Sequence, residues 1–179
     1  MKKYLPLRWA ASLALVAVML AALASCMMSP DDPAADERAA NRDYLASVNR
    51  VISALTTDLE RFSEAVSQRD VVGMNAQADS ASRSIDELLR LEPPSGLVDV
   101  HTEHAKGCRE LRDALDAYRA LFAEIDAATE ARPFDFSTYE PRVSNIQKAY
   151  EKGISHLEKA DQLLTSLVDP EADAGTEAE

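Results

Sequence analysis

The sequence predicts an all-α domain, an antiparallel up-down-up-down four-helix bundle with heptad packing like that of a coiled coil. Three observations support this fold. Ala, Leu, Glu, Asp and Arg dominate the 179 residues and β-branched or aromatic runs are scarce, so local conformational preference favours helix. Apolar residues recur at alternating steps of three and four along four segments. Short turns separate these segments, as expected for consecutive helices that run in opposite directions.

The first two predicted helices lie between residue 44 and the proline pair at 93–94. The polar segment 67–70 separates them, and Asp70 is a good N-cap for the second helix. Pro93 and Pro94 end that second helix because proline cannot continue a helix. The first stripe is Leu45, Val48, Ile52, Leu55, Leu59, Phe62 and Val66, and the second is Val71, Met74, Ala78, Ala81, Ile85 and Leu88.

The third and fourth predicted helices span about 96–130 and 139–168. Ser95 is expected to cap the third helix. A loop at 131–141 follows it, and Ser137 and Glu140 have the spacing of a capping box for the fourth helix. The third stripe is Leu97, His101, His104, Cys108, Leu111, Leu115, Tyr118, Phe122 and Ile125, and the fourth is Tyr139, Val143, Ile146, Tyr150, Gly153, Leu157, Ala160, Leu164 and Leu167. These four helices define one domain at 44–168, followed by an acidic tail at 169–179 that is too poor in apolar residues to fold.

The N-terminus has the organisation of an export signal. Lys2, Lys3 and Arg8 precede an apolar run at 10–23, which is shorter than the ~20 residues that span a bilayer as a helix. The run ends in Leu23-Ala24-Ser25-Cys26, which resembles the bacterial lipobox. The resemblance implies that residues 1–25 are a lipoprotein signal peptide that is removed. It also implies that Cys26 carries a diacylglyceryl group, often joined by an N-acyl chain such as palmitate.

Lipidation at Cys26 would anchor the chain to a membrane without spanning it, because several acyl chains together hold a protein effectively for good. The anchor would lie on the outer face of the cell membrane, or on an outer membrane where one exists, since residue 27 is not Asp. The polar segment 26–43 is expected to be a stalk that becomes helical from Pro30 or Pro33. With Cys26 lipidated, Cys108 has no cysteine partner in its own chain, so stability must come from packing rather than from an internal disulfide.

Charge excludes one class of partner. Three of the 19 basic residues lie in the signal segment, whereas all 31 acidic residues follow position 25, so the remaining chain has 16 basic against 31 acidic residues and a formal net charge of −15. Such a surface repels phosphate backbones, and no basic stripe offsets it. We therefore expect no nucleic-acid partner. A membrane contact through the lipid and an envelope protein partner remain.

His101, His104 and Cys108 are the most distinctive candidate site in the predicted bundle. On a helix these residues lie at i, i+3 and i+7 and share one face, as ligands of Zn²⁺ or Cu⁺ would need to. The same spacing, however, continues the apolar stripe of the third helix, and free cysteine commonly behaves as a small apolar residue. We favour a place in the core over a metal site, and we expect no cofactor.

The loop at 131–141 is the second candidate site. Phe134, Phe136 and Tyr139 concentrate there, at the end of the bundle opposite the lipid. Exposed aromatic side chains bind protein partners, whereas buried ones would close the end of the core. Both interpretations stay open at the level of sequence.

Catalytic patterns are absent from the sequence, which contains no Glu-x-x-His, Cys-x-x-Cys-His, His-Glu-x-x-His, glycine-rich phosphate loop or nucleophile elbow. We therefore expect a protein that is not an enzyme. The leading hypothesis is a membrane-anchored lipoprotein outside the cytoplasm, whose bundle is a non-catalytic binding or assembly module of the cell envelope. A metal- or small-ligand-binding lipoprotein that uses His101, His104 and Cys108 is one alternative, and a structural spacer is another. The sequence leaves the oligomeric state open.

Overall fold

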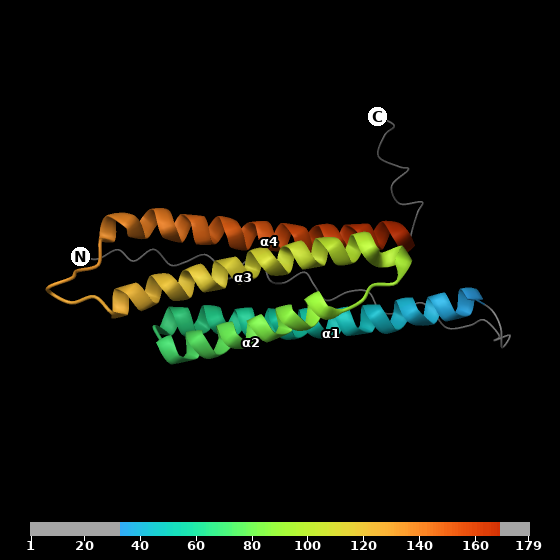
Figure 1. The fold of residues 1–179 in the computed structure, drawn as a ribbon, viewed down its shortest axis with the longest axis horizontal. Helices are drawn as coiled ribbons and strands as arrows, with labels where there is room; N and C mark the ends of the chain where they lie inside the picture. Colours follow the sequence, from blue (N-terminus) through green and yellow to red (C-terminus); the bar gives the residue numbers. More distant parts are fainter. Residues whose placement is uncertain (1–32, 169–179) are drawn as a thin grey trace, which may run out of the picture.

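The computed structural model describes residues 33–168, which form an antiparallel bundle of helices (Figure 1). These are α1 (Pro33–Gln68), α2 (Val71–Arg90), α3 (Val98–Asp126) and α4 (Tyr139–Val168), with short 3-10 turns η2 (Ser95–Leu97) and η3 (Phe136–Thr138). The described part of the chain contains no strand, so the predicted all-α bundle is confirmed. The predicted signal peptide 1–25, the lipidation residue Cys26, the first part of the stalk and the acidic tail 169–179 lie outside the described residues.

Consecutive helices pack against each other along the α1–α2, α2–α3 and α3–α4 seams, and the α3–α4 seam is the most extensive. Figure 1 shows the 69–70 turn and the 127–138 connection together at one end, which we call the loop end. The start of α1, the 91–97 connection and the end of α4 lie at the other, which we call the entry end. The predicted placement of the 131–141 aromatics opposite the start of the first helix is therefore confirmed. None of the helices in 33–168 has a stretch both long and apolar enough to cross a membrane.

The turn between α1 and α2 forms as the sequence predicts. Arg69 adopts a left-handed conformation with φ 59°, and the Asp70 N–H donates to the Ala65 carbonyl at 2.9 Å, which closes the end of α1. The Asp70 side chain then accepts from the Gly73 N–H at 2.9 Å, which is the predicted N-cap of α2. The first helix is longer than the stripe alone suggested, because residues 33–43 of the expected stalk are helical.

Two predicted caps are wrong. Ser95 begins η2 and makes no capping hydrogen bond from its side chain. Asp135 caps the turn η3 that leads into α4, and its carboxylate accepts from both the backbone N–H and the hydroxyl of Ser137, at 2.9 and 2.6 Å. The Ser137 side chain makes a hydrogen bond to Asp135 and none to the first turn of α4 within the described residues. Helix α3 also ends earlier than predicted, at Asp126.

The core lies along the predicted stripes and is widest on α3. Most stripe positions on α1, α2 and α3 are buried, and α3 also buries residues beside its stripe, since it contacts both α2 and α4. The additional buried residues of α3 are Val100, Glu103, Ala105, Gly107, Ala114 and Leu121. Two stripe positions are predicted wrongly: Val71 at the start of α2 and Leu167 at the end of α4 are exposed.

Glycine lets α3 and α4 approach closely. A Cβ atom added at Gly107 would lie 2.8 Å from the Gly153 carbonyl oxygen and 2.8 Å from Leu157 Cδ2. A Cβ added at Gly153 would lie 2.8 Å from Leu111 Cγ and 3.1 Å from the Gly107 carbonyl oxygen. Real Cβ atoms essentially never come within 3.0 Å of other atoms, so a side chain at Gly107 would clash with the α4 backbone, and one at Gly153 would displace Leu111 and crowd the α3 backbone. The two helix backbones pack directly against each other here.

Replacing Gly107 with alanine should therefore destabilise the bundle. Helix propensity alone would favour Gly107→Ala by about 1 kcal/mol, but the clash with the α4 backbone should outweigh this and lower the free energy of unfolding by about 1–3 kcal/mol net. Urea unfolding followed by circular dichroism measures the difference. Gly96→Ala is the matched control, because an added Cβ there meets nothing within 4 Å. A Gly107→Ala variant as stable as the control would contradict the close approach.

Candidate functional site

The structure separates the two predicted candidate sites to opposite ends of the bundle. His101, His104 and Cys108 lie in the first turns of α3, toward the entry end, and the 127–138 connection with its aromatic residues forms the loop end (Figure 1). The two sites differ in exposure as well. His104 and Cys108 are buried and His101 is half-buried, whereas the loop end contains an open hollow.

His101 pairs with a tyrosine of α1. Its Nδ1 lies 2.8 Å from the Tyr44 hydroxyl, and the two rings make an edge-on contact with centroids 6.0 Å apart. Burial lowers the pKa of His101, with a further contribution from the Arg109 charge, and burial raises the pKa of Tyr44 to about 12. Both side chains are therefore neutral at pH 7 and are joined by a hydrogen bond. Sequence reasoning missed Tyr44, which lies 57 residues away from His101.

His104 and Cys108 belong to the buried core. His104 is 4% exposed, and its Nδ1 has no hydrogen-bond partner among the described residues. Burial lowers the pKa of His104 to about 4, so the imidazole is neutral at pH 7. Cys108 is fully buried, and burial raises its pKa to about 12, so it stays a thiol and packs as a small apolar group.

The metal hypothesis gains no support from this geometry. Within residues 33–168, no group of three or more His, Cys, Asp and Glu side chains is arranged to hold a metal ion. Metal ligation by cysteine uses the thiolate, whereas burial keeps Cys108 protonated. His101 already shares its Nδ1 with Tyr44. The three residues follow the packing of α3 against its neighbours.

A buried carboxylate, which sequence reasoning missed, links α3 to α4 beside these residues. The Glu103 side chain accepts from Lys106 Nζ at 2.8 Å, His156 Nδ1 at 2.7 Å and Lys159 Nζ at 3.3 Å. The hydrogen bonds from Lys106 and His156 lower the pKa of Glu103 to about 2. Because an ionised carboxylate can only accept, His156 donates this hydrogen bond from Nδ1. The i, i+3 spacing of Glu103 and Lys106 was visible in the sequence, but His156 and Lys159 lie on another helix.

Glu103→Gln should change how stability depends on pH. The Glu103 carboxyl titrates at about 2 in the folded chain, well below its ordinary value of 4.5, so it contributes stability above pH 4.5 that is lost as pH falls toward 2. The glutamine variant should be less stable at pH 7 and lose less stability across that window. Urea unfolding at a series of pH values measures this. Glu130 lies exposed in the loop, so Glu130→Gln is the control and should lose as much stability at low pH as the wild type. If Glu103→Gln also lost as much stability between pH 4.5 and 2 as the wild type, the assignment would be contradicted.

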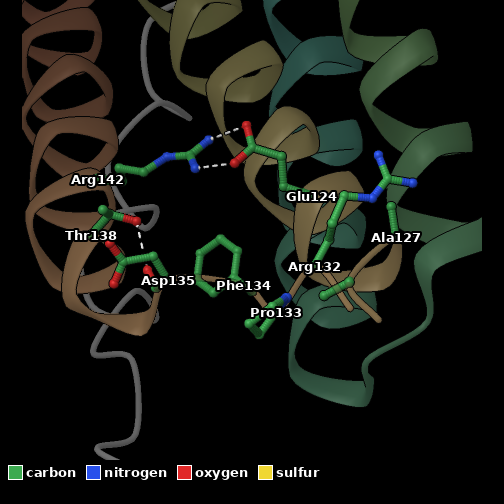
Figure 2. A pocket seen from close by; sticks show the side chains of 9 residues that line it. Glu124, Ala127, Arg132, Pro133, Phe134, Asp135, Thr138 and Arg142 are labelled. Carbon is green, nitrogen blue, oxygen red and sulfur yellow. Dashed lines mark hydrogen bonds and ion pairs between the residues drawn. The ribbon is translucent and has the colours of Figure 1, made fainter. Parts of the chain in front are cut away.

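The loop end contains an open hollow of about 700 Å³ between the end of α3, the 127–138 connection and the start of α4. Figure 2 shows Phe134 near its centre, below an ion pair between Glu124 of α3 and Arg142 of α4. This pair is bidentate, with N–O distances of 2.5 and 2.9 Å. The hydrogen bond between them lowers the pKa of Glu124 and raises that of Arg142. The ion pair between α3 and α4 therefore forms one polar side of the hollow, and the Phe134 ring of the loop lies next to it.

The three predicted aromatic residues take different positions. Phe134 is half-buried, lines the hollow and contacts Phe136 edge-on with ring centroids 5.1 Å apart. Phe136 is 70% exposed, so it does not close the core. Tyr139 is half-buried against the core and is not among the residues that line the hollow. The structure therefore brings the rings of Phe134 and Phe136 together, whereas the Tyr139 ring packs against the core outside the hollow.

Backbone contacts hold the connection in shape around Phe134. Thr129 and Arg132 exchange two backbone hydrogen bonds, of 3.0 and 3.1 Å, and the Thr138 hydroxyl donates to the Asp135 carbonyl at 2.8 Å. Figure 2 places Asp135 and Thr138 on one side of the Phe134 ring and Arg132 on the other. The hollow is thus lined by one aromatic ring and several charged groups, with no arrangement of nucleophile and base among its lining residues.

Comparison with known proteins gives no relative. No protein family, curated protein or solved structure matches the chain.

Proposed function

We propose that this chain is a bacterial lipoprotein of the cell envelope, anchored through lipid on Cys26, whose bundle is a non-catalytic binding or assembly module. The single observation that supports binding best is the open hollow of about 700 Å³ at the loop end, with Phe136 exposed beside it. Large exposed aromatic residues are typical anchors of protein interfaces. The lipobox residues Leu23-Ala24-Ser25-Cys26 support the anchor.

The shape of the bundle fits an anchored binding module. The start of α1 is the part of the bundle that follows Cys26 most closely in the chain. The loop end lies at the opposite end of the bundle (Figure 1). At 1.5 Å per residue, a helix of the length of α3 holds the two ends about 40–45 Å apart. A partner bound at the loop end would therefore be kept at this distance from the membrane surface.

A protein segment fits the loop hollow better than a small metabolite. The volume lies within the range of about 300–1,000 Å³ that is usual for ligand pockets, but such pockets enclose most of their ligand. Here the lining residues Pro133, Asp135 and Thr138 are exposed, and Phe134 is half-buried. An open surface with one aromatic residue exposed beside it and charged groups around it resembles the edge of a protein interface.

The anchor assignment predicts the behaviour of a Cys26→Ala variant. Wild-type chain expressed in bacteria should incorporate radioactive fatty acid and sediment with membranes, because Cys26 is the acceptor of the lipid. Cys26→Ala should lose the label, while Cys108→Ala, which removes the other cysteine, should retain it. Retained label in Cys26→Ala would overturn the anchor.

The binding assignment predicts where the protein crosslinks in its native cells. A photocrosslinking amino acid at position 136 should form a discrete adduct with an envelope protein, because Phe136 is exposed at the loop end. Position 98 is the matched control, since Val98 is an exposed apolar residue of α3 near the entry end. Adducts of equal yield at both positions, or no adduct at 136, would contradict a partner site at the loop end. The structural spacer would then be the remaining hypothesis.

A further inference from the structure

A second hollow lies beside the first, between the start of α2 and the end of α3. It has a volume of about 220 Å³, and the buried side chains of Met74 and Tyr118 and the half-buried Phe122 supply its apolar part. Arg119 and Asp126 add charged groups. This groove is smaller than the roughly 300–1,000 Å³ of pockets that hold a whole small molecule. Its size suits one long side chain from a partner.

The apolar part of the groove is built from aromatic rings. Tyr118 and Phe122 stack with centroids 4.8 Å apart and an interplanar angle of 18°, and Phe62 meets Tyr118 edge-on at 5.5 Å. The face of an aromatic ring attracts a cation through its quadrupole. The polarizable thioether of Met74 and the ring of Phe122 also suit the aliphatic stem of a long basic side chain.

The unpaired charge in the groove is negative. Arg119 is held by Asp79 at 2.9 Å and by Asn75 at 3.1 Å, so its positive charge is matched. Asp126 has no ion pair or side-chain hydrogen bond within the described residues. It ends α3, where the negative end of the helix dipole adds to its charge. At the start of α2, the opposite end of a helix dipole is already capped by the Asp70 carboxylate.

We propose that this groove binds a lysine or arginine side chain presented by a basic, amphipathic segment of a partner protein. The stem lies along Met74 and Phe122, and the cationic head reaches the Asp126 carboxylate. Val72, which is 80% exposed beside the groove residue Val71, offers apolar surface to the neighbouring residues of the same segment. The formal charge of −15 after residue 25 attracts such a segment over distance. The inference rests on the proposed binding function and names the chemistry of the partner.

The test uses the purified full chain in neutral detergent micelles, with its methionine methyl groups isotopically labelled. The probes are a short peptide of alternating lysine and leucine pairs and a matched peptide with glutamate in place of lysine. Isothermal titration measures affinity, and the Met74 methyl signal in NMR reports whether the groove is the site. The lysine peptide should bind and shift the Met74 methyl signal, and the glutamate peptide should not.

Three variants locate the interaction. Asp126→Asn removes the unpaired negative charge in the groove. It should lower the affinity for the lysine peptide by about threefold or more, which corresponds to the loss of one exposed charge pair. Asp113→Asn removes the same charge from an exposed position about 20 Å along α3 and should leave affinity unchanged. Phe122→Leu keeps an apolar side chain but removes the ring, so it should weaken binding while a circular dichroism melt confirms that the bundle still folds.

Several results would overturn the proposal: no binding of the lysine peptide, equal binding of the glutamate peptide, or equal loss in Asp113→Asn and Asp126→Asn. An unmoved Met74 methyl signal would do the same, since binding would then lie elsewhere. These results are distinct from failure of the proposed function, which is read from lipid labelling and from crosslinking at position 136 in cells. Peptide binding in the groove with no crosslink at 136 would support the groove and contradict the loop hollow.

Discussion

The close backbone approach of α3 and α4 at Gly107 and Gly153 is the constraint on which the rest of the structure depends. It fixes how closely α4 approaches α3 at this point of their seam, which is the most extensive seam in the bundle. One turn toward the entry end, the same approach brings Glu103 within reach of His156 and Lys159. Toward the loop end it aligns Glu124 with Arg142, and these two residues form the wall of the hollow. A wider separation of the two helices would separate both pairs.

Packing and binding features occupy different parts of the bundle. Near the entry end, two polar contacts join helices inside the protein: Tyr44 pairs with His101, and Glu103 pairs with its three basic partners. At the loop end, exposed Phe136 and unpaired Asp126 face outward beside two hollows. The proposed function and the groove proposal both place recognition at the loop end for this reason. The long helices between the two ends stabilise the bundle and hold the loop end away from the entry end.

Much of the fold follows from local sequence, whereas little of the site does. The three-four stripes predicted the helices, and Asp70 was recognised as a cap because capping acts within one turn. The Glu103 network and the Tyr44–His101 bond depend on which helices lie side by side, and their partners are 53–57 residues apart in sequence. Gly107 was also missed, because periodicity detects side chains that fill space and cannot show where a missing side chain is required. Phe134 and Phe136 were found because aromatic residues stand out in a polar loop.

A double-mutant cycle between Gly107→Ala and Gly153→Ala tests the central claim most directly. Each added methyl group should force the same two helices apart. Once one methyl group is present, the second should therefore lower the free energy of unfolding only slightly further. The free energy of unfolding of the double variant should then fall by less than the sum of the single losses, with a coupling of about 1 kcal/mol or more. Additive losses, or single variants more stable than the wild type, would contradict the claim that bare backbone at both positions sets the α3–α4 packing.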